Sequence, residues 1–342
     1  MNKSNKTKIA TLLAVCFFAL AAMTAFCIVL LFNNIKDNSR TFVIEPNSTY
    51  EEVVDGLVSN SIIKSEKSFR IASRLIGYSK PKTGRYKLSD CESNLDLLMI
   101  LRRGQHFPVR FTFNNIRTKE QFVKKVGDKF FFEPEELSAL LQDNQYLEKY
   151  GLNDTNIVSM FIPNTYEFYY DITAEVFLDK FYGYYTDFWT EDRIRLAKEA
   201  GLSKVEVSTL ASIVEEENSR AAEKAIIAGL YINRLRKGML LQSDPTVKFA
   251  LGDFTRQRIL NADLQVDSPY NTYRYKGLPP GPIRIPEAST VDSVLHYRHH
   301  NFIFMCAKED FSGYHNFTDS PAVHMQNAAR YRKALNERNI TR

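Results

Sequence analysis

Three consecutive glutamates, Glu215, Glu216 and Glu217, are the residues of this sequence best suited to acid–base chemistry. They lie in residues 202–221, where apolar residues recur at the spacing of one helix face. On a helix turning about 100° per residue, Glu217 falls within the apolar stripe, whereas Glu215 and Glu216 fall on the polar side. The stripe is formed by Val207, Leu210, Ile213, Val214 and Ala221.

A carboxylate on a buried helix face is costly when ionised, so we expect Glu217 to have a raised pKa or a partner. A glutamic acid with a raised pKa between apolar walls is what general acid catalysis requires. The alternative is that the helix ends near Asn218 and leaves Glu217 exposed, with Arg220 available as a salt-bridge partner. We expect Glu215 and Glu216 to lie on a solvated face.

The elements around these glutamates are helices followed by a long loop region. Between residues 242 and 287, Gly, Pro, Asn and Tyr cluster. Because proline is excluded from helix interiors and glycine permits positive φ, this region is predicted as a structured loop surface, of the kind that often carries function. The other predicted elements here are helices over 173–189, 191–200 and 204–236, a strand over 302–307 and an amphipathic helix over 324–338.

The N-terminal half contains a small α+β module, residues 41–105. Residues 106–160 are predicted to connect it to a larger α+β domain, residues 161–342. The fold class is therefore α+β with two domains. Within the module the predicted order is a strand over 41–46, a helix from residue 48, a helix over 69–77, a strand over 84–88 and a helix over 94–102.

Residues 9–32 contain no charge and no proline, and about 20 apolar residues span a bilayer as a helix. Lysines and no acidic residue precede this segment, so the positive-inside rule places residues 1–8 in the cytoplasm and the rest outside. The alternative is a signal peptide cleaved near Ala25, but the apolar run continues past the small residues there. The polar residues 33–40 are predicted as a tether.

Composition and missing motifs exclude several function classes. The net charge of the 342 residues is +5, and the sequence has no dense run of Lys and Arg of the kind that would indicate nucleic-acid binding. The phosphate loop of NTPases, the dinucleotide-binding fingerprint and the zincin motif are all missing. His296, His299 and His300 lack an acidic or cysteine ligand at zinc spacing, so we expect surface histidines, no metal and no cofactor. Cys91 and Cys306 are expected as free buried thiols rather than a disulfide.

Five pieces of sequence occur in an order that is typical of one family. The pieces are ASIVEEE (211–217), YINRLRKGMLLQSDPTV (231–247), YNTYRYKGLPPGPI (270–283), Pro286, and YHNF (314–317) followed by His324. With them the chain resembles the YceG-like, or MltG, family of endolytic murein transglycosylases. The single membrane helix and the small LysM-like module of that family also fit residues 9–32 and 41–105.

The resemblance implies a membrane-anchored lytic transglycosylase, a carbon–oxygen lyase. Such an enzyme cleaves the MurNAc-β-1,4-GlcNAc bond within the glycan strands of peptidoglycan and leaves 1,6-anhydroMurNAc ends. It would terminate the elongation of nascent strands from the cell (inner) membrane, with an extracytoplasmic catalytic domain and penicillin-binding peptidoglycan synthases as candidate partners. The family motif I-[IV]-E-x-E has its catalytic acid at the second glutamate, which is Glu217 here.

Further residues are candidates for substrate binding. Gln242, Ser243 and Asp244 follow the helix predicted over 204–236, and their side chains can hydrogen-bond sugar hydroxyls or the acetamido group. Turn structure is an equal alternative for these residues. The face of Tyr273 can stack on a pyranose, and Arg234 can bind lactyl or peptide carboxylates or pair with an acidic neighbour. The candidates are Gln242, Ser243, Asp244, Asn271, Tyr273, Arg234 and His315.

Two other functions remain open at this point. Both standard glycosidase geometries need two carboxylates, so a muramidase-type hydrolase would use Glu217 with Asp244. With Glu217 alone, the substrate's acetamido group can stabilise the cation and Glu217 can then accept the proton of the sugar O6. The second alternative is a non-enzymatic glycan-binding envelope scaffold. The loop region and the position of Glu217 on an apolar stripe favour an enzyme.

Overall fold

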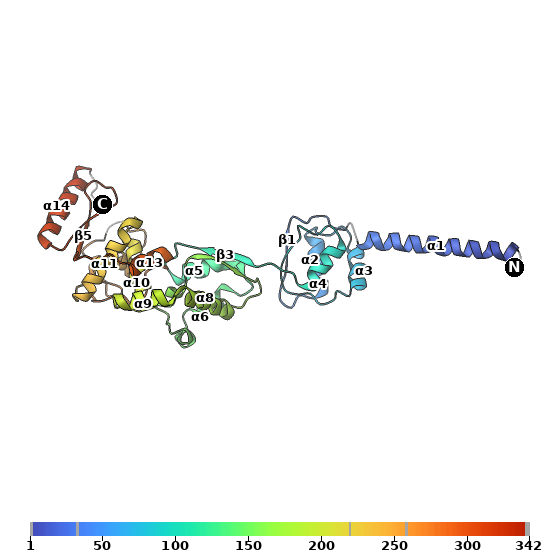
Figure 1. The fold of residues 1–342 in the computed structure, drawn as a ribbon, viewed down its shortest axis with the longest axis horizontal. Coiled ribbons are helices and arrows are strands. Elements are labelled where there is room, and N and C mark those ends of the chain that lie inside the picture. The colour runs from blue at the N-terminus through green and yellow to red at the C-terminus, as the bar shows by residue number, and fades with distance from the viewer. Residues whose placement is uncertain (1–2, 32–33, 219, 257–258, 339–342) are drawn as a thin grey trace. The chain divides into compact units, whose positions relative to one another are not determined.

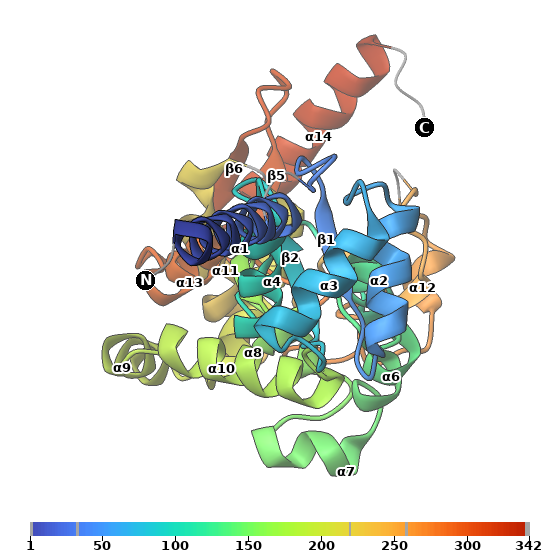
Figure 2. The same ribbon diagram turned by 90° about the vertical axis from the view of Figure 1, so that its right-hand side faces the viewer.

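The computed structural model describes residues 3–31, 34–218, 220–256 and 259–338, and it has a mixed α and β fold (Figure 1 and Figure 2). The chain divides into two compact units. The first unit comprises Met1–Arg110, Asp128–Phe132 and Glu167–Thr173, and the second comprises Phe111–Gly127, Glu133–Tyr166 and Ala174–Arg342.

Helix α1 (Lys3–Leu31), deep blue in Figure 1, is the apolar helix expected from the sequence. Its segment Lys8–Ile28 reaches a mean hydropathy of 2.4, and its large apolar side chains are exposed. By length and composition it can cross a membrane, a property that a signal sequence shares. The end of the predicted span, Phe32, and the following Asn33 lie outside the described residues.

The first unit contains the small module, in the predicted order of strand, two helices, strand and helix. Strands β1 and β2 form an antiparallel pair in which Thr41 is opposite Lys87. Helix α2 begins at a capping box between Thr49 and Glu52, because each satisfies a main-chain amide of the other. The elements are β1 (Thr41–Ile44), α2 (Tyr50–Ser59), α3 (Glu66–Ile76), β2 (Gly84–Lys87) and α4 (Asn94–Arg103).

Residues 34–40, predicted as a tether, contact this module. Asn34 is buried, and its amide donates to Asn94 Oδ1 at 2.8 Å. Its Oδ1 accepts a hydrogen bond from the Ser65 amide at 2.8 Å. The apolar core of the module includes Phe42, Ile44, Val54, Leu57, Phe69, Tyr86, Leu97 and Leu101.

The second unit begins with an aromatic core. The rings of Phe111, Phe122 and Phe181 are buried and pack edge to face. Strand β3 pairs with β4. The elements of residues 109–188, some of which are divided between the two units, are β3 (Val109–Phe113), α5 (Lys119–Val126), α6 (Pro134–Leu140), α7 (Asn144–Leu147), β4 (Asn164–Phe168) and α8 (Ala174–Phe188), with 3-10 turns at Gly127–Lys129, Glu148–Tyr150 and Ile157–Met160.

The helix predicted over 204–236 is wrong as one continuous element. It is two helices, α10 (Lys204–Glu217) and α11 (Ala221–Arg236), and α9 (Glu191–Ala200) precedes them. Asn218 between them is extended, with φ −151°. Its side chain stabilises the break, because Oδ1 accepts a hydrogen bond from the Arg220 amide and Nδ2 donates to buried Glu223.

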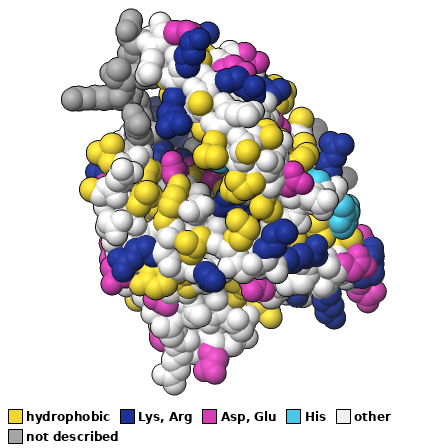
Figure 3. Space-filling model, turned by 90° about the vertical axis from the view of Figure 1, so that its left-hand side faces the viewer, with side chains coloured by type: hydrophobic (Ala, Val, Ile, Leu, Met, Phe, Trp, Pro, Cys, Tyr) yellow, Lys and Arg dark blue, Asp and Glu magenta, His cyan; other side chains and the backbone are white. Residues whose placement is uncertain are grey.

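The C-terminal part carries the loop region and a small antiparallel sheet. Strands β5 and β6 pair with Phe304 opposite Thr318, and α14 packs against β5. In Figure 3, basic and acidic side chains on one face are interspersed and form no continuous basic stripe among the coloured residues. The elements are α12 (Asp244–Leu251), a 3-10 turn at Asp263–Gln265, α13 (Ala288–Leu295), β5 (Phe304–Ala307), β6 (His315–Thr318) and α14 (Pro321–Glu337).

Candidate active site

Glu217 is the last residue of α10. The stripe residues Val207, Leu210, Ile213 and Val214 are buried as the sequence predicts, but Ala221 is exposed at the start of α11. The helix begins at Ser203, whose side chain forms a capping box with Glu206. Fourteen helical residues therefore separate the cap from the point where the chain turns away at Asn218. The helix does end where the alternative interpretation placed its end, but Glu217 is half-buried rather than exposed.

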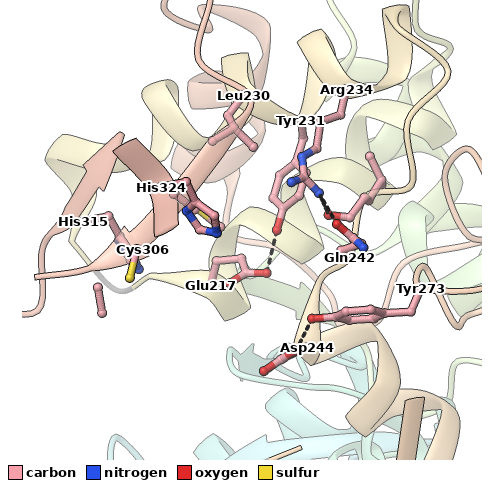
Figure 4. Close-up of a pocket in the computed structure, with 13 residues that line it drawn as sticks. Glu217, Leu230, Tyr231, Arg234, Gln242, Asp244, Tyr273, Cys306, His315 and His324 are labelled. Atoms are coloured by element: carbon pink, nitrogen blue, oxygen red, sulfur yellow. Dashed lines mark hydrogen bonds between the residues drawn. The ribbon is translucent and has the colours of Figure 1, made fainter. Parts of the chain in front are cut away.

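Two hydroxyl groups hold the Glu217 carboxyl group, of which Figure 4 shows that of Tyr231. Tyr231 Oη, from α11, donates to Glu217 Oε1 at 2.6 Å, and Ser243 Oγ donates to the same oxygen at 2.5 Å. Among the described residues, no hydrogen bond is formed with Glu217 Oε2. One oxygen is thus fixed by the protein, and the other is available to a ligand.

The pKa of Glu217 is raised above the ordinary glutamic acid value, chiefly because burial disfavours the charged carboxylate. The hydrogen bonds from Ser243 and Tyr231 oppose this shift, because they stabilise the carboxylate. The negative charge of Asp244 raises the pKa further, whereas the interaction with His315 lowers it. Burial dominates, so the group is disposed to act as an acid.

A cavity of about 340 Å³ opens on one side of Glu217, and we name it the Tyr231 cavity. Figure 4 shows side chains from α11, the following loop and the C-terminal sheet converging on it. It brings together most of the site residues predicted from the sequence. Those that line it are Glu217, Arg234, Gln242, Asp244, Tyr273 and His315.

A second cavity of about 550 Å³ also borders Glu217, and we name it the Arg220 cavity. It shares Glu217, Ala307 and His315 with the Tyr231 cavity. Its remaining walls include Arg117, Arg220, Arg284 and Tyr314. Glu217 therefore lies where the two cavities meet.

Ser243 and Asn271 are fully buried, and their side chains stabilise the residues that line the cavity. Ser243 uses its hydroxyl group on Glu217, as described above. The Asn271 amide donates to the carbonyl groups of Leu264 and Val266, at 2.9 and 2.8 Å, and so fixes the loop. Gln242 lines the cavity from a left-handed backbone conformation, with φ 54°.

Asp244 and Tyr273 form a pair at the mouth of the Tyr231 cavity. Tyr273 Oη donates to Asp244 Oδ1 at 2.6 Å. Burial and the neighbouring Asp244 carboxylate raise the pKa of Tyr273, so this phenol is neutral at any physiological pH. Asp244 lies in the first turn of α12, where a negative charge is favourable.

Arg234 is buried and is engaged mainly by the main chain. Its guanidinium group donates to the carbonyl oxygens of Ile303, Leu240 and Leu241 at 2.7–3.0 Å. It also lies over the ring of Phe304. These contacts connect the loop after α11 to the segment before β5. They use most of the hydrogen-bond donors of the Arg234 guanidinium group, so few remain for the substrate carboxylate that the sequence suggested as its ligand.

His315 is held by a buried carboxylate. Its Nδ1 lies 2.8 Å from Glu223 Oε2, and its main-chain amide donates to Glu223 Oε1 at 2.9 Å. Asn218 Nδ2 donates to Glu223 Oε2 at 2.6 Å. The orientation of His315 at the border of both cavities is therefore fixed by residues on either side of the α10–α11 break.

The expectation that Glu215 and Glu216 lie on a solvated face is wrong. Their side chains are only 8% and 18% exposed. Arg284, from the loop before α13, lies 3.3 Å from a Glu215 oxygen and 2.6 Å from Glu216 Oε1, and Arg117 pairs with Glu216 from the other side. The periodicity of α10 does not reveal that a distant loop covers its polar face with arginines.

Among the described residues, no cluster of His, Cys, Asp and Glu is arranged to hold a metal ion. His296 and His299 are exposed, and His300 Nε2 lies 2.9 Å from the Ile226 carbonyl oxygen. All four cysteines are free, including buried Cys91 and partly buried Cys306.

The sequence interpretation missed Tyr231 as the partner of Glu217. Tyr231 is in the quoted motif and on the buried face of α11, but the 14-residue separation has no meaning until the chain turns at Asn218. The loop partner of Glu217, Ser243, was expected to bind substrate. The recurrence of apolar residues around Tyr231 was the one available signal that its hydroxyl group would be buried and need a partner.

Comparison with known proteins gives a consistent result. The model of the YceG-like family matches residues 42–330. An endolytic murein transglycosylase from Bacillus subtilis is 29% identical over 324 residues, which is 89% of each chain. One from Streptococcus pneumoniae is 26% identical over 298 residues, which is 76% of this chain and 53% of that protein.

A solved structure also shares the fold. The crystal structure of a YceG-like protein from Listeria monocytogenes matches with a TM-score of 0.56 and 24% identity, over 85% of this chain and 99% of that one. The resemblance inferred from the five sequence pieces is confirmed by the family match. Since that match extends over most of its length, the chain belongs to the YceG-like family.

Proposed function

We propose that this protein is a lytic transglycosylase that cleaves the MurNAc-β-1,4-GlcNAc bond within peptidoglycan glycan strands and leaves 1,6-anhydroMurNAc ends. The names of the relatives from Bacillus subtilis and Streptococcus pneumoniae support the reaction class. The observation that carries the proposal is Glu217, an acid with a raised pKa at the junction of two cavities.

The hydrogen bonds of Glu217 suit the first half of the reaction. Because Tyr231 and Ser243 both donate to Oε1, that oxygen takes the carbonyl role and the proton resides on Oε2. The proton is transferred from Oε2 to the glycosidic oxygen as the C1–O4 bond breaks. Tyr231 and Ser243 then stabilise the carboxylate that forms.

The second half of the reaction closes a ring. The substrate's acetamido group stabilises the positive charge at C1, and the Glu217 carboxylate accepts the proton of the same sugar's O6. The C1–O6 bond then forms, and Glu217 returns to its acid form. No water is consumed, and one carboxyl group serves both steps, in contrast to hydrolases that use two.

Asp244 supports a second candidate, a muramidase-type hydrolase. It lines the Tyr231 cavity with Glu217, so a water held between them would complete a hydrolytic pair. Its carboxylate is already engaged by Tyr273, which favours a role in shaping the cavity.

Digestion of purified glycan strands by the full-length protein in detergent tests the proposal. We expect new ends lighter by one water than hydrolytic products, detected by mass spectrometry. Reducing muramic-acid ends would instead assign the reaction to the hydrolase with Asp244. Binding of strands without any new ends would favour the glycan-binding scaffold.

The rest of the chain is proposed to place this site at the membrane. Helix α1 would anchor the protein in the cell membrane with its N-terminus in the cytoplasm, and residues 41–105 would hold glycan as a LysM-like module. Residues 161–342 would be the catalytic domain, with 106–160 as the connection. From that position the enzyme would terminate nascent strands near penicillin-binding synthases.

A further inference from the structure

We propose that the Arg220 cavity is a subsite for the carboxylate-bearing side of the scissile bond, with Arg220 and Tyr314 as its recognition residues. The inference rests on the proposed function and extends it to the orientation of the strand. The ligand chemistry is a pyranose that carries a carboxylate, either on its lactyl group or on an attached peptide. The neutral sugar on the other side of the bond then occupies the Tyr231 cavity.

The loop before β6 holds the Arg220 guanidinium group in place. Arg220 Nη2 donates to the Ser312 carbonyl oxygen at 3.0 Å, and the guanidinium carbon lies 5.5 Å from the centre of the Tyr314 ring. Gly313 between them has φ +79°, and a Cβ there would lie 3.3 Å from Arg220 Nε. The absence of a side chain at this left-handed position lets the guanidinium group lie against the backbone.

The charges around the Arg220 cavity favour an anion. Two glutamates in its wall are already paired: Glu216 with Arg117 and Arg284, and Glu215 with Arg284. Lys224 also lies 3.9 Å from Glu215. Glu217 is the third glutamate of the wall and is uncharged while it acts as an acid. Three arginines therefore face two carboxylates.

The Arg220 guanidinium group has hydrogen-bond donors that remain available to a ligand. No carboxylate of the described residues forms an ion pair with it, and the residue is exposed. Guanidinium groups bind carboxylates through two parallel hydrogen bonds, so its outer edge suits such a ligand. The ring of Tyr314 beside it is 37% exposed, and an aromatic face next to a charged donor suits a sugar ring with an acidic substituent.

The Tyr231 cavity lacks these features. Its arginine, Arg234, is buried and donates to main-chain carbonyl groups, and Asp244 adds a negative charge. A carboxylate would be repelled by Asp244 there, whereas hydroxyl and acetamido groups would find Gln242 and Tyr273. The difference in charge between the two cavities orients a strand of alternating sugars. The carboxylate-bearing sugar lies next to Glu217 in the Arg220 cavity, and the neutral sugar lies in the Tyr231 cavity.

Binding of acidic and neutral oligosaccharides separates this role from a general effect on the fold. The experiment uses full-length Glu217→Gln protein in detergent, which binds without turnover. The probes are peptide-free peptidoglycan oligosaccharides, the same oligosaccharides with peptide stems, and chitooligosaccharides of equal length as the neutral ligand. Adding Arg220→Gln should weaken binding of the acidic ligand about tenfold or more and leave chitooligosaccharide affinity within about twofold.

Three further arms complete the test. Arg220→Lys should retain part of the preference for the acidic ligand, Tyr314→Leu should weaken both ligands, and Arg195→Gln on exposed α9 should change neither. A loss confined to peptide-free ligand identifies the lactyl carboxylate, and a loss confined to peptide-bearing ligand identifies the stem. Equal losses for acidic and neutral ligands, or no loss, would overturn the proposal. Cleavage by protein with Glu217 intact is scored separately, so failure of the reaction and failure of the subsite are distinguishable.

Discussion

At the residue scale, Glu217 receives both of its short hydrogen bonds on one oxygen. Glu217→Gln retains an oxygen that can accept from Tyr231 and Ser243 but has no carboxylic proton to donate. We expect strand cleavage to fall by about 10²–10⁴-fold or more, because the same group serves both half-reactions. The rate at which anhydro ends form measures this effect.

The same variant should be at least as stable as the wild type at neutral pH. Burial raises the folded-state pKa of Glu217 above 4.5, so ionisation costs the wild type stability as pH rises through that pKa. Below the unfolded pKa both states hold the proton, and the difference disappears. Urea unfolding at acidic and neutral pH tests this. A variant that is less stable at neutral pH than at acidic pH, relative to wild type, would contradict the burial argument.

Tyr231→Phe removes one donor to Glu217 while keeping the ring. Since the hydrogen bond from Tyr231 lowers the pKa of Glu217, its loss should raise that pKa further. The acid form would then persist to higher pH, so the alkaline limb of kcat/KM should move to higher pH. An unchanged limb would show that Tyr231 does not act through Glu217. Tyr297→Phe, in a surface tyrosine bonded to Arg236, is the matched control.

At the element scale, ion pairs attach α10 to two distant segments. Glu216 binds Arg284 of the loop before α13 and Arg117 of the segment after β3. Glu216→Gln should destabilise the fold by about 1–3 kcal/mol, because both arginines lose a half-buried charge partner. Urea unfolding measures the loss.

The control for this prediction is Glu199→Gln on α9. Glu199 is 58% exposed and pairs with exposed Arg195, so its loss should lie within about 0.5 kcal/mol. Similar values for the two variants would mean that Glu216 contributes no more than a surface charge.

The sequence predicts an apolar face of α10 on which Glu217 lies, because periodicity depends on local geometry alone. It cannot predict what covers that face. Tyr231 and Arg284 come from segments whose positions depend on the turn at Asn218 and on loop packing. The break at Asn218 has a local component, because its side chain accepts a hydrogen bond from the Arg220 amide two residues on and donates to Glu223 five residues on. Its contact with the Gly313 carbonyl oxygen joins residues that are distant in the sequence.

At the scale of the whole molecule, α1 makes the proposed membrane topology testable. A reporter enzyme fused after Arg342 should be active only on the outer side of the membrane, because lysines precede the apolar helix. A fusion after residue 8 should report the cytoplasm. Release of a soluble form cleaved near Ala25 would show that the helix is a signal sequence.

The order of elements within 41–105 could be predicted, as could α8, α9, α14 and the strand β5, whereas α12, α13 and β6 are not predicted. The predicted elements depend on local interactions: helix caps such as Ser203 and Thr49, and the alternation of strands, involve residues that are close in the sequence. Association of distant residues, such as Asn34 with Asn94, is not local and has no periodic signal.

The position of Glu217 at the final residue of α10 has an electrostatic consequence of its own. The aligned peptide dipoles of a helix give its C-terminal end a partial negative charge, which disfavours a nearby anion by about 0.3–1 kcal/mol. Burial and this macrodipole act in the same direction and hold the proton on Glu217. Once the proton has left, the same field favours its recapture, so the helix itself promotes the return of the acid to its starting state.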